Sequence, residues 1–484
     1  MAPTNIPEGF LGNLTADQQK KLEQLWTIIL SLSDALSSTA TDTNEPHHRR
    51  NSSLARTNTA ASKGSTATTP AYAAQVSQHL QGLGLHAPEI KQVQHVLTQI
   101  TPEEIRDGLL STAKHDHPDV LLLRFLRARK WDVNKAFVMM LDAIVWRMKE
   151  FHVDEEVIAK GELHALKASR DPSNAVAAKN GKDFLAQMRM GKAYVHGVDK
   201  LGRPIVVIRV KLHKPGAQSE ETLNQFIIHV IESVRLLLAP PVETAAVVFD
   251  MTGFGLSNME YPPVKFIIKC FEANYPESLG VLLIHNAPWV FSGTIGFLLQ
   301  EEYRLTRPGI WRLIKGWMDP VIVSKIQFTR TIADMEKFIP RDQIVKELGG
   351  TEDWTYEYVE PDENENDRME DTAARDALVA QRASIGDELL NATAKWVTAI
   401  KNKDEKETAA AKAHRDELIE QLRSNYWQLD PYVRSRNYLD RTGVIREGGK
   451  IDFYPKSQPQ SDVEVAKVVE VEHVEQTQAQ VVNV

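Results

Sequence analysis

Tyr275-Pro276-Glu277-Ser278 is followed by an apolar run at 281–284 and by Asn286-Ala287-Pro288-Trp289, and the stretch ends at Asp319-Pro320-Val321-Ile322-Val323-Ser324-Lys325-Ile326. The apolar run predicts a buried strand next to a carboxylate and a proline turn, and the later segment leads to one lysine. This arrangement is poorly suited to covalent chemistry. It suits the binding of an amphiphile that has a charged head and an apolar body.

Alternating strand and helix patterns around this stretch predict an α/β core at 185–350. Strands are predicted at 194–196, 205–210, 245–249, 281–284 and 326–331, and helices at 220–238 and 262–273. The run 245–249 is apolar throughout, which is typical of a strand buried on both faces of a parallel sheet. The strand–helix–strand order predicts crossover connections and a mostly parallel sheet.

The segments before the core predict helices that are separated by a disordered insert. Residues 1–36 form a helical extension, and 37–78 are rich in Ser, Thr, Ala and Asn, a composition that cannot offset its ordering entropy. A helical domain is predicted at 95–160. Thr101 and Glu104 make a capping box in it, and Pro118 suits the first position of the next helix.

After the core, the sequence predicts an exposed acidic linker at 352–371 and a helical extension at 372–454. Leu418, Leu422, Tyr426 and Leu429 follow helical spacing, so this extension either docks on the body of the protein or binds a protein partner. Docking is the commoner fate of an amphipathic helix. Residues 455–484 are polar and predict no regular structure.

The overall composition excludes several classes of protein. The chain has 484 residues, 42% of them hydrophobic, and a net charge of −8, so no global charge attracts nucleic acid or acidic membranes. Cys270 is the single cysteine, which excludes a disulfide framework and a cysteine zinc site. No basic N-terminal signal and no apolar run of about 18 residues is present, which predicts a cytoplasmic protein.

Sequence motifs for enzymatic chemistry are also missing. The chain has no Gly-x-Ser-x-Gly elbow and no Walker A loop, and Gly253-Phe254-Gly255 lacks the third glycine of a dinucleotide fingerprint. His47-His48 lies in the predicted disordered insert, where solvation is the simpler reading. We therefore predict no catalytic residues, no metal and no cofactor.

Several motifs in the same order resemble the CRAL-TRIO family, in particular its fungal phosphatidylinositol transfer proteins. They are LLRFLRARKWD at 122–132, Asp199-Lys200-Leu201-Gly202-Arg203-Pro204, Tyr275-Pro276-Glu277, Asn286-Ala287-Pro288 and the segment 319–326. The resemblance covers roughly residues 100–350. It implies an N-terminal helical bundle on an α/β lobe, and a lipid cavity with a sheet floor and a mobile apolar helix that closes it.

The resemblance also implies three residues that bind an inositol phosphate headgroup. Arg129 matches the headgroup arginine, Glu277 the carboxylate that accepts inositol hydroxyls, and Lys325 the lysine that meets the phosphodiester. A buried inositol phosphate needs cationic donors and an acceptor, because its desolvation is otherwise uncompensated. Each residue alone could equally be an ordinary surface or helix-end residue. Together the three favour the headgroup site.

The chain departs from the family pattern at three places. Ile322 stands where phosphatidylcholine-exchanging members carry a threonine, and Ala245 and Val247 replace hydroxyl residues linked to phosphatidylcholine. An apolar wall cannot orient a zwitterionic headgroup, so we expect phosphatidylcholine to bind poorly. Residues 294–309 form an insertion before the expected gate helix 310–318. We interpret it as a retained intron, and sequencing of the transcript would test this.

The resemblance predicts a gate made of Ile310, Trp311, Leu313, Ile314 and Trp317, which either touches the membrane transiently or belongs to the core. The expected function is non-enzymatic uptake of one phospholipid, phosphatidylinositol first, and its exchange between membranes. Two alternatives stay open: a carrier of a sterol or squalene-like hydrophobe, and a lipid-sensing scaffold that presents the C-terminal helices to a protein partner. A hydrolase is the least favoured alternative.

Overall fold

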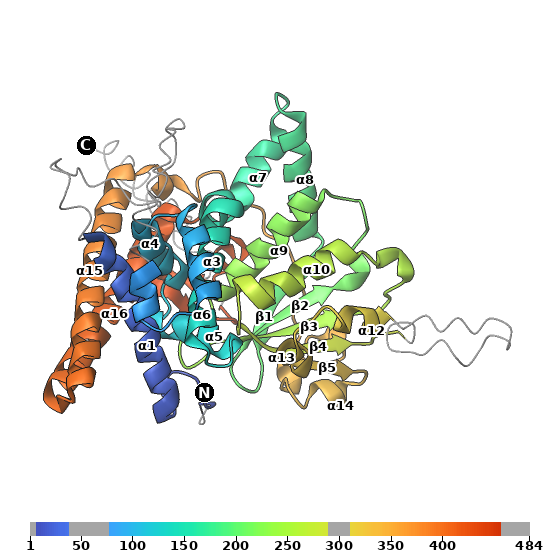
Figure 1. Ribbon diagram of the computed structural model, residues 1–484. Coiled ribbons are helices and arrows are strands. Elements are labelled where there is room, and N and C mark those ends of the chain that lie inside the picture. The colour runs from blue at the N-terminus through green and yellow to red at the C-terminus, as the bar shows by residue number, and fades with distance from the viewer. Residues whose placement is uncertain (1–5, 38–76, 289–309, 456–484) are drawn as a thin grey trace, which may run out of the picture.

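The computed structural model describes residues 6–37, 77–288 and 310–455. It contains an N-terminal helical bundle, an α/β lobe and a C-terminal helical hairpin (Figure 1). The predicted α/β class with an N-terminal bundle and additional C-terminal helices is confirmed. The predicted disordered segments 37–78 and 455–484 fall almost wholly outside the described residues, as does the whole of 294–309.

The sheet of the α/β lobe has five strands, and their order in space is their order in the sequence. They are β1 (Ala193–Val198), β2 (Pro204–Arg209), β3 (Ala245–Asp250), β4 (Leu279–His285) and β5 (Ile326–Thr329). β1 is antiparallel to β2, and all the other neighbours are parallel, as the sequence predicts. The N-terminal ends of β2 to β5 therefore share one edge of the sheet.

Two helices lie over the sheet and leave a cavity beneath them (Figure 1). α9 (Glu220–Arg235) begins where the hydroxyl of Ser219 accepts a hydrogen bond from the Thr222 amide, and it ends three residues before the predicted 238. α10 (Tyr261–Lys269) continues as one π-helical turn, Cys270–Asn274. The predicted helix 262–273 thus consists of an α-helix followed by a π-helical turn.

The N-terminal bundle packs around α5, whose residues Pro118 to Leu126 are all buried. Its helices are α1 (Ala16–Ser37), α3 (Ala87–Leu97), α4 (Pro102–Ala113), α5 (Pro118–Ala128) and α6 (Val133–Val145). The capping box of Thr101 and Glu104 is formed, and Pro118 is the first residue of α5, as predicted. α6 passes into a π-helical turn, Trp146–Glu150.

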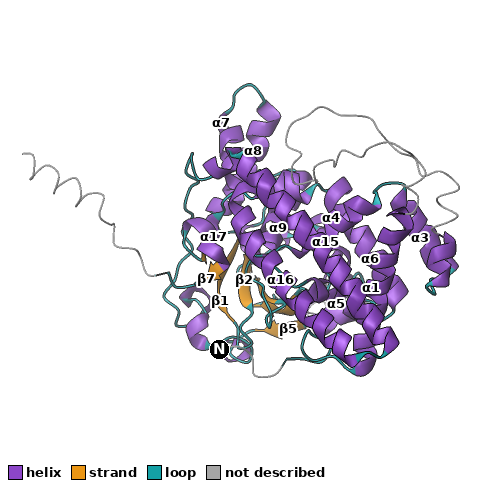
Figure 2. Ribbon diagram, turned by 90° about the vertical axis from the view of Figure 1, so that its left-hand side faces the viewer, coloured by secondary structure: helices purple, strands orange, loops and turns teal. Residues whose placement is uncertain are grey.

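The C-terminal extension is an antiparallel hairpin of α15 (Thr372–Asn402) and α16 (Glu405–Val433), which lies against the N-terminal bundle (Figures 1 and 2). Buried Arg415 on α16 contacts Asp119 of α5 at 2.8 Å between Nη2 and Oδ1. The indole of Trp26 on α1 donates to the same carboxylate at 2.7 Å. The extension therefore docks on the body of the protein.

The acidic linker is more closely packed than the sequence suggests. Trp354, Tyr356 and Tyr358 occur at every second position, and they pack against the core of the α/β lobe. Tyr356 donates its hydroxyl to the carbonyl oxygen of Met188 at 2.8 Å. The expectation of an exposed linker is wrong for this part, because an extended chain with aromatic residues at every second position buries one face.

Glu162, on α7 (Gly161–Arg170), joins four segments that are distant in the sequence. Its carboxylate accepts from the Tyr358 hydroxyl at 2.8 Å and the Tyr438 amide at 3.0 Å, lies 3.1 Å from Nε2 of His229, and contacts Arg441. Burial alone would raise the pKa of Glu162, but these donors and charges lower it to about 2. The carboxylate is therefore ionised in the folded protein.

We predict that acid weakens the fold through Glu162. Its folded pKa of about 2 lies below the ordinary value of 4.5, so its contribution is complete above about pH 4.5 and is lost as the pH falls towards 2. The shift corresponds to about 3 kcal/mol of unfolding free energy. Urea unfolding should show that the parent has a higher free energy of unfolding than Glu162→Gln near pH 4.5 and that this difference shrinks towards pH 2. A difference that stays constant with pH would contradict the assignment.

Candidate functional site

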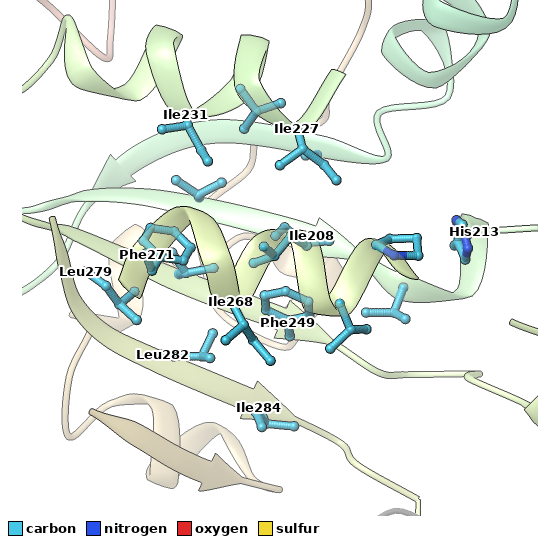
Figure 3. Close-up of a pocket in the computed structure, with 18 of the residues that line it drawn as sticks. Ile208, His213, Ile227, Ile231, Phe249, Ile268, Phe271, Leu279, Leu282 and Ile284 are labelled. Atoms are coloured by element: carbon cyan, nitrogen blue, oxygen red, sulfur yellow. The ribbon is translucent and has the colours of Figure 1, made fainter. Parts of the chain in front are cut away.

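An apolar cavity with a volume of about 260 Å³ lies between the sheet and helices α9, α10 and α12 (Ile310–Lys315). Figure 3 shows its wall, which is almost entirely hydrocarbon. Residues that project into it include Ile208, Ile227, Ile231, Phe249, Ile268, Phe271, Leu279, Leu282 and Ile284. Such a wall favours a ligand with a large apolar body.

Glu277 and Lys325 form an ion pair beside one end of this cavity. The distance between Lys325 Nζ and Glu277 Oε2 is 3.0 Å, and the side chains are 18% and 14% exposed. Glu277 lies in the turn before β4, and Lys325 ends α13 (Pro320–Ser324) just before β5. Parallel pairing of β4 and β5 brings these two strand starts together. Their chain neighbours Ser278 and Ile326 line the cavity.

Glu277 is held by local backbone geometry. Its φ of 56° lies in the left-handed region, which side-chain-bearing residues adopt rarely. The following Ser278 donates its hydroxyl to the carbonyl oxygen of Tyr275 at 2.6 Å, which closes the turn. The turn fixes the carboxylate at the edge of the sheet, where Lys325 meets it.

Arg129 lies elsewhere. Its guanidinium donates to the carbonyl oxygen of Ala128 at 3.2 Å, and its side chain lines a separate cavity of about 430 Å³. Asp142 of α6 and Lys269 of α10 line that second cavity as well. The structure thus brings two of the three predicted headgroup residues together and places the third apart from them.

Arg127, two residues before Arg129 in the same motif, interacts electrostatically with Glu277 of the pair. Burial lowers the pKa of Arg127, and the carboxylates of Glu243 and Glu277 oppose this shift. Arg127 Nη2 lies 3.0 Å from Glu243 Oε2. Arg129, in contrast, lies just past the last residue of α5, Ala128, and its side chain lines the second cavity.

The predicted gate residues divide between the cavity and the surface. Trp311 and Ile314 line the cavity, while Leu313 is 41% exposed. Trp317 packs edge-on against Tyr261 with ring centres 5.5 Å apart, and Ile310 is half-buried. α12 ends at Lys315, earlier than the predicted 318.

The residues at which this chain departs from the family pattern lie in the cavity wall. Ala245, Val247 and Ile322 all line the cavity. None of their side chains carries a hydrogen-bonding group, so this wall offers no hydroxyl at those positions. The expected weak binding of phosphatidylcholine stays a prediction.

Among the described residues, no group of three or more His, Cys, Asp or Glu side chains is arranged to hold a metal ion. The helices of that part of the chain are all too short or too polar to cross a bilayer.

Comparisons with known proteins agree with this geometry. The CRAL/TRIO domain matches residues 188–300 and 307–350, and the CRAL/TRIO N-terminal domain matches 89–142. A CRAL-TRIO domain-containing protein of Schizosaccharomyces pombe is 40% identical over 74% of this chain and 72% of its own length. The phosphatidylinositol transfer protein CSR1 of Eremothecium gossypii is 38% identical over 74% of this chain and 75% of its own.

A more distant relative covers a smaller part of the chain. The Sec14 cytosolic factor of Schizosaccharomyces pombe is 26% identical over 48% of this chain and 74% of its own length. The two more similar relatives extend well beyond the α/β lobe, and both are matched over more than two thirds of their length. With its domain matches and these relatives, the chain belongs to the CRAL-TRIO family.

Proposed function

We propose that this protein takes up one phospholipid, phosphatidylinositol, in the apolar cavity and exchanges it between membranes. The observation that carries the proposal is the partly buried Glu277–Lys325 pair beside one end of a largely apolar cavity. Family members bind and transfer lipids, and a relative that is 38% identical is named a phosphatidylinositol transfer protein. No covalent bond changes in such an exchange.

The ion pair would exchange partners when the headgroup enters. The phosphodiester carries a negative charge, so it attracts the ammonium of Lys325 away from the single oxygen of Glu277 that it now contacts. The carboxylate of Glu277 then accepts hydrogen bonds from inositol hydroxyls. Both charges stay compensated in this arrangement, which limits the desolvation penalty.

The two arginines have different proposed parts. Arg127 stays bonded to Glu243 and contributes positive potential to the headgroup end. Arg129 remains a candidate headgroup residue, but it would reach the pair only if the C-terminal end of α5 moved. Arg129→Met is therefore expected to lower phosphatidylinositol transfer less than a substitution of Lys325 does.

The proposed gate is α12 and the turn that follows it. Trp311 and Ile314 line the cavity, so a lipid that enters between α12 and the sheet must displace them. One buried lipid replaces another during exchange, so the net free-energy change is small and gate opening is expected to set the rate. Exposed Leu313 is placed to touch a membrane when the gate opens.

Filling the cavity is expected to stop transfer without unfolding the protein. Leu282→Trp places a larger ring in the cavity, where Leu282 is one of the lining residues. Transfer of labelled phosphatidylinositol between vesicles should fall by about 10-fold or more, because the ring occupies space that the acyl chains need. The urea midpoint should shift little, since the added atoms enter open space.

Leu256→Trp is the matched control, because Leu256 is 65% exposed and lies outside the cavity lining. It should transfer phosphatidylinositol at the parental rate. Equal transfer by Leu282→Trp and the parent would show that the lipid does not occupy this cavity.

A further inference from the structure

A polar cluster interrupts the apolar cavity at its other end. Lys192, His213 and Glu260 all line the cavity. Lys192 Nζ lies 3.1 Å from His213 Nδ1, and His213 Nε2 lies 2.8 Å from Glu260 Oε2. The three side chains therefore form one hydrogen-bonded chain from a cation through an imidazole to a carboxylate.

This cluster is far from the Glu277–Lys325 pair. Figure 3 places His213 at the opposite end of the cavity from Leu279, which lies next to the turn that holds Glu277. The five residue steps from Leu279 to Ile284 along β4 span about 16 Å, at a strand rise of about 3.3 Å per residue. The cavity thus has polar groups at both ends and hydrocarbon between them.

The cluster is held by the ends of three elements. Lys192 precedes β1, and its carbonyl oxygen accepts from the Arg209 amide at 2.9 Å. His213 follows β2, and its carbonyl oxygen accepts from Nδ2 of Asn258 at 2.8 Å. Glu260 is the residue immediately before α10. The positions of all three groups are therefore set by the fold.

Lys192 carries a donor that the described part of the chain leaves open. An ammonium group has three N–H donors. Gln187 Oε1, at 3.1 Å, and His213 Nδ1 account for two, and among the described residues no third acceptor lies within hydrogen-bond distance. Lys192 is 6% exposed, so water reaches it poorly. Burial lowers the pKa of Lys192 to about 8, opposed by the charge of Glu260.

A buried cation with an open donor in a hydrocarbon wall is an anchoring point for one oxygen atom. We propose that Lys192, positioned by His213 and Glu260, binds the carboxylate or hydroxyl oxygen at the end of an otherwise apolar lipid. The body of that lipid fills the same cavity, with its polar end opposite to the Glu277–Lys325 pair. This inference rests on the proposed function only in that the cavity holds lipid.

The single open donor of the cluster disfavours a phosphoinositol headgroup at this end of the cavity. One open amine donor matches one oxygen, whereas the several hydroxyls of inositol would lie unpaired against apolar side chains. The ligand class is therefore a fatty acid or a sterol, which share a single polar end. Both would compete with phosphatidylinositol, because the apolar bodies overlap in the cavity.

The test measures binding of oleate, cholesterol and squalene to the full-length chain. Each lipid is supplied in radiolabelled form, and the bound fraction is measured after the protein is separated from free lipid. Lys192→Met should weaken the binding of oleate or cholesterol by about 10-fold or more, which is the loss in affinity expected when a hydrogen bond from a charged donor is removed. Binding of squalene, which has no oxygen, should change by less than about twofold.

Two further variants separate the possible outcomes. Lys211→Met is the matched control, since Lys211 is in the neighbouring segment but outside the cavity lining, and it should bind like the parent. Glu260→Gln keeps an acceptor for His213 but removes a negative charge. It should strengthen oleate binding and leave cholesterol unchanged, which identifies the carboxylate or the hydroxyl as the anchored group.

The proposal is overturned if the parent binds neither oleate nor cholesterol, or if folded Lys192→Met binds them as the parent does. Circular dichroism verifies folding, and if Lys192→Met does not fold, Lys192→Leu, which also lacks a donor, takes its place. If oleate binding depends on Lys192 but phosphatidylinositol is not transferred, the proposed function is refuted and this inference stands. If phosphatidylinositol is transferred but neither oleate nor cholesterol binding depends on Lys192, this inference is refuted and the proposed function stands.

Discussion

Replacing Lys325 with methionine is expected to lower phosphatidylinositol transfer by about 10-fold to 100-fold, the range for losing a hydrogen bond between charged groups. The change removes the cation proposed to meet the phosphodiester. It also leaves the carboxylate of Glu277, now 3.0 Å from the ammonium, without its partner. An unpaired carboxylate at the headgroup end repels the phosphate, so the two effects act in the same direction.

The measurement is transfer of labelled phosphatidylinositol between vesicles, with squalene binding as the internal reference. Lys337→Met is the matched control, because Lys337 pairs with Asp334 on the surface and its side chain is 67% exposed. Squalene binding should survive in Lys325→Met, since the apolar wall is unchanged. If Lys325→Met transferred phosphatidylinositol at the parental rate, the Glu277–Lys325 pair would not be the headgroup site.

The second large effect concerns stability. Glu232→Gln is expected to lower the free energy of unfolding by about 3–5 kcal/mol, the range for breaking a buried ion pair. Glu232 on α9 is 4% exposed, and its carboxylate forms ion pairs with three cationic side chains. The distances are 2.6 Å to Lys114, 2.7 Å to Arg147 and 3.1 Å to Arg235.

Glu232 is central because it joins the two lobes of the protein. Lys114 and Arg147 come from the N-terminal bundle and its continuation, while Glu232 and Tyr275 belong to the α/β lobe, and the Tyr275 hydroxyl donates to Glu232 at 2.8 Å. Burial would raise the pKa of Glu232, but the surrounding cations hold it well below its ordinary value. A neutral amide would leave buried cations without their counter-charge.

Urea unfolding at neutral pH measures this effect. Glu156→Gln is the matched control, because Glu156 pairs with Lys160 on the surface with side chains 42% and 41% exposed, and such pairs contribute about 0–1 kcal/mol. A Glu232→Gln variant within about 1 kcal/mol of the parent would contradict the role of this network.

The fold was largely predictable because its signals are local. The apolar runs that became β3 and β4 are continuous and bounded by turn residues, so strand positions and parallel pairing followed from the sequence. Element ends were less predictable: the predicted helix 220–238 ends at Arg235, and the predicted helix 262–273 ends in a π-helical turn. Those ends depend on tertiary contacts.

The buried charges could not be predicted in the same way. Arg415 is 2% exposed, although arginine is seldom fully buried, and its partner Asp119 lies 296 residues away in the sequence. This internal ion pair depends on a long-range contact, which local sequence patterns do not predict. The helical extension predicted at 372–454 contains a hairpin whose turn lies at Lys403.

The candidate site was predicted in part. Glu277 and Lys325 were identified by motif, and parallel pairing of β4 and β5 brings them together. Arg129 was selected by motif position alone, and it lies just past the end of α5, where its side chain lines the second cavity. The Lys192–His213–Glu260 cluster had no sequence signal, because its residues lie at the ends of three separate elements.

Native mass spectrometry with lipid extraction on the purified full-length protein tests the central claim most directly. We predict one phosphatidylinositol molecule bound per chain in the parent and its loss in Lys325→Met, with both proteins folded. A sterol or neutral hydrocarbon as the bound lipid, held equally by the parent and Lys325→Met, would contradict the phosphatidylinositol assignment.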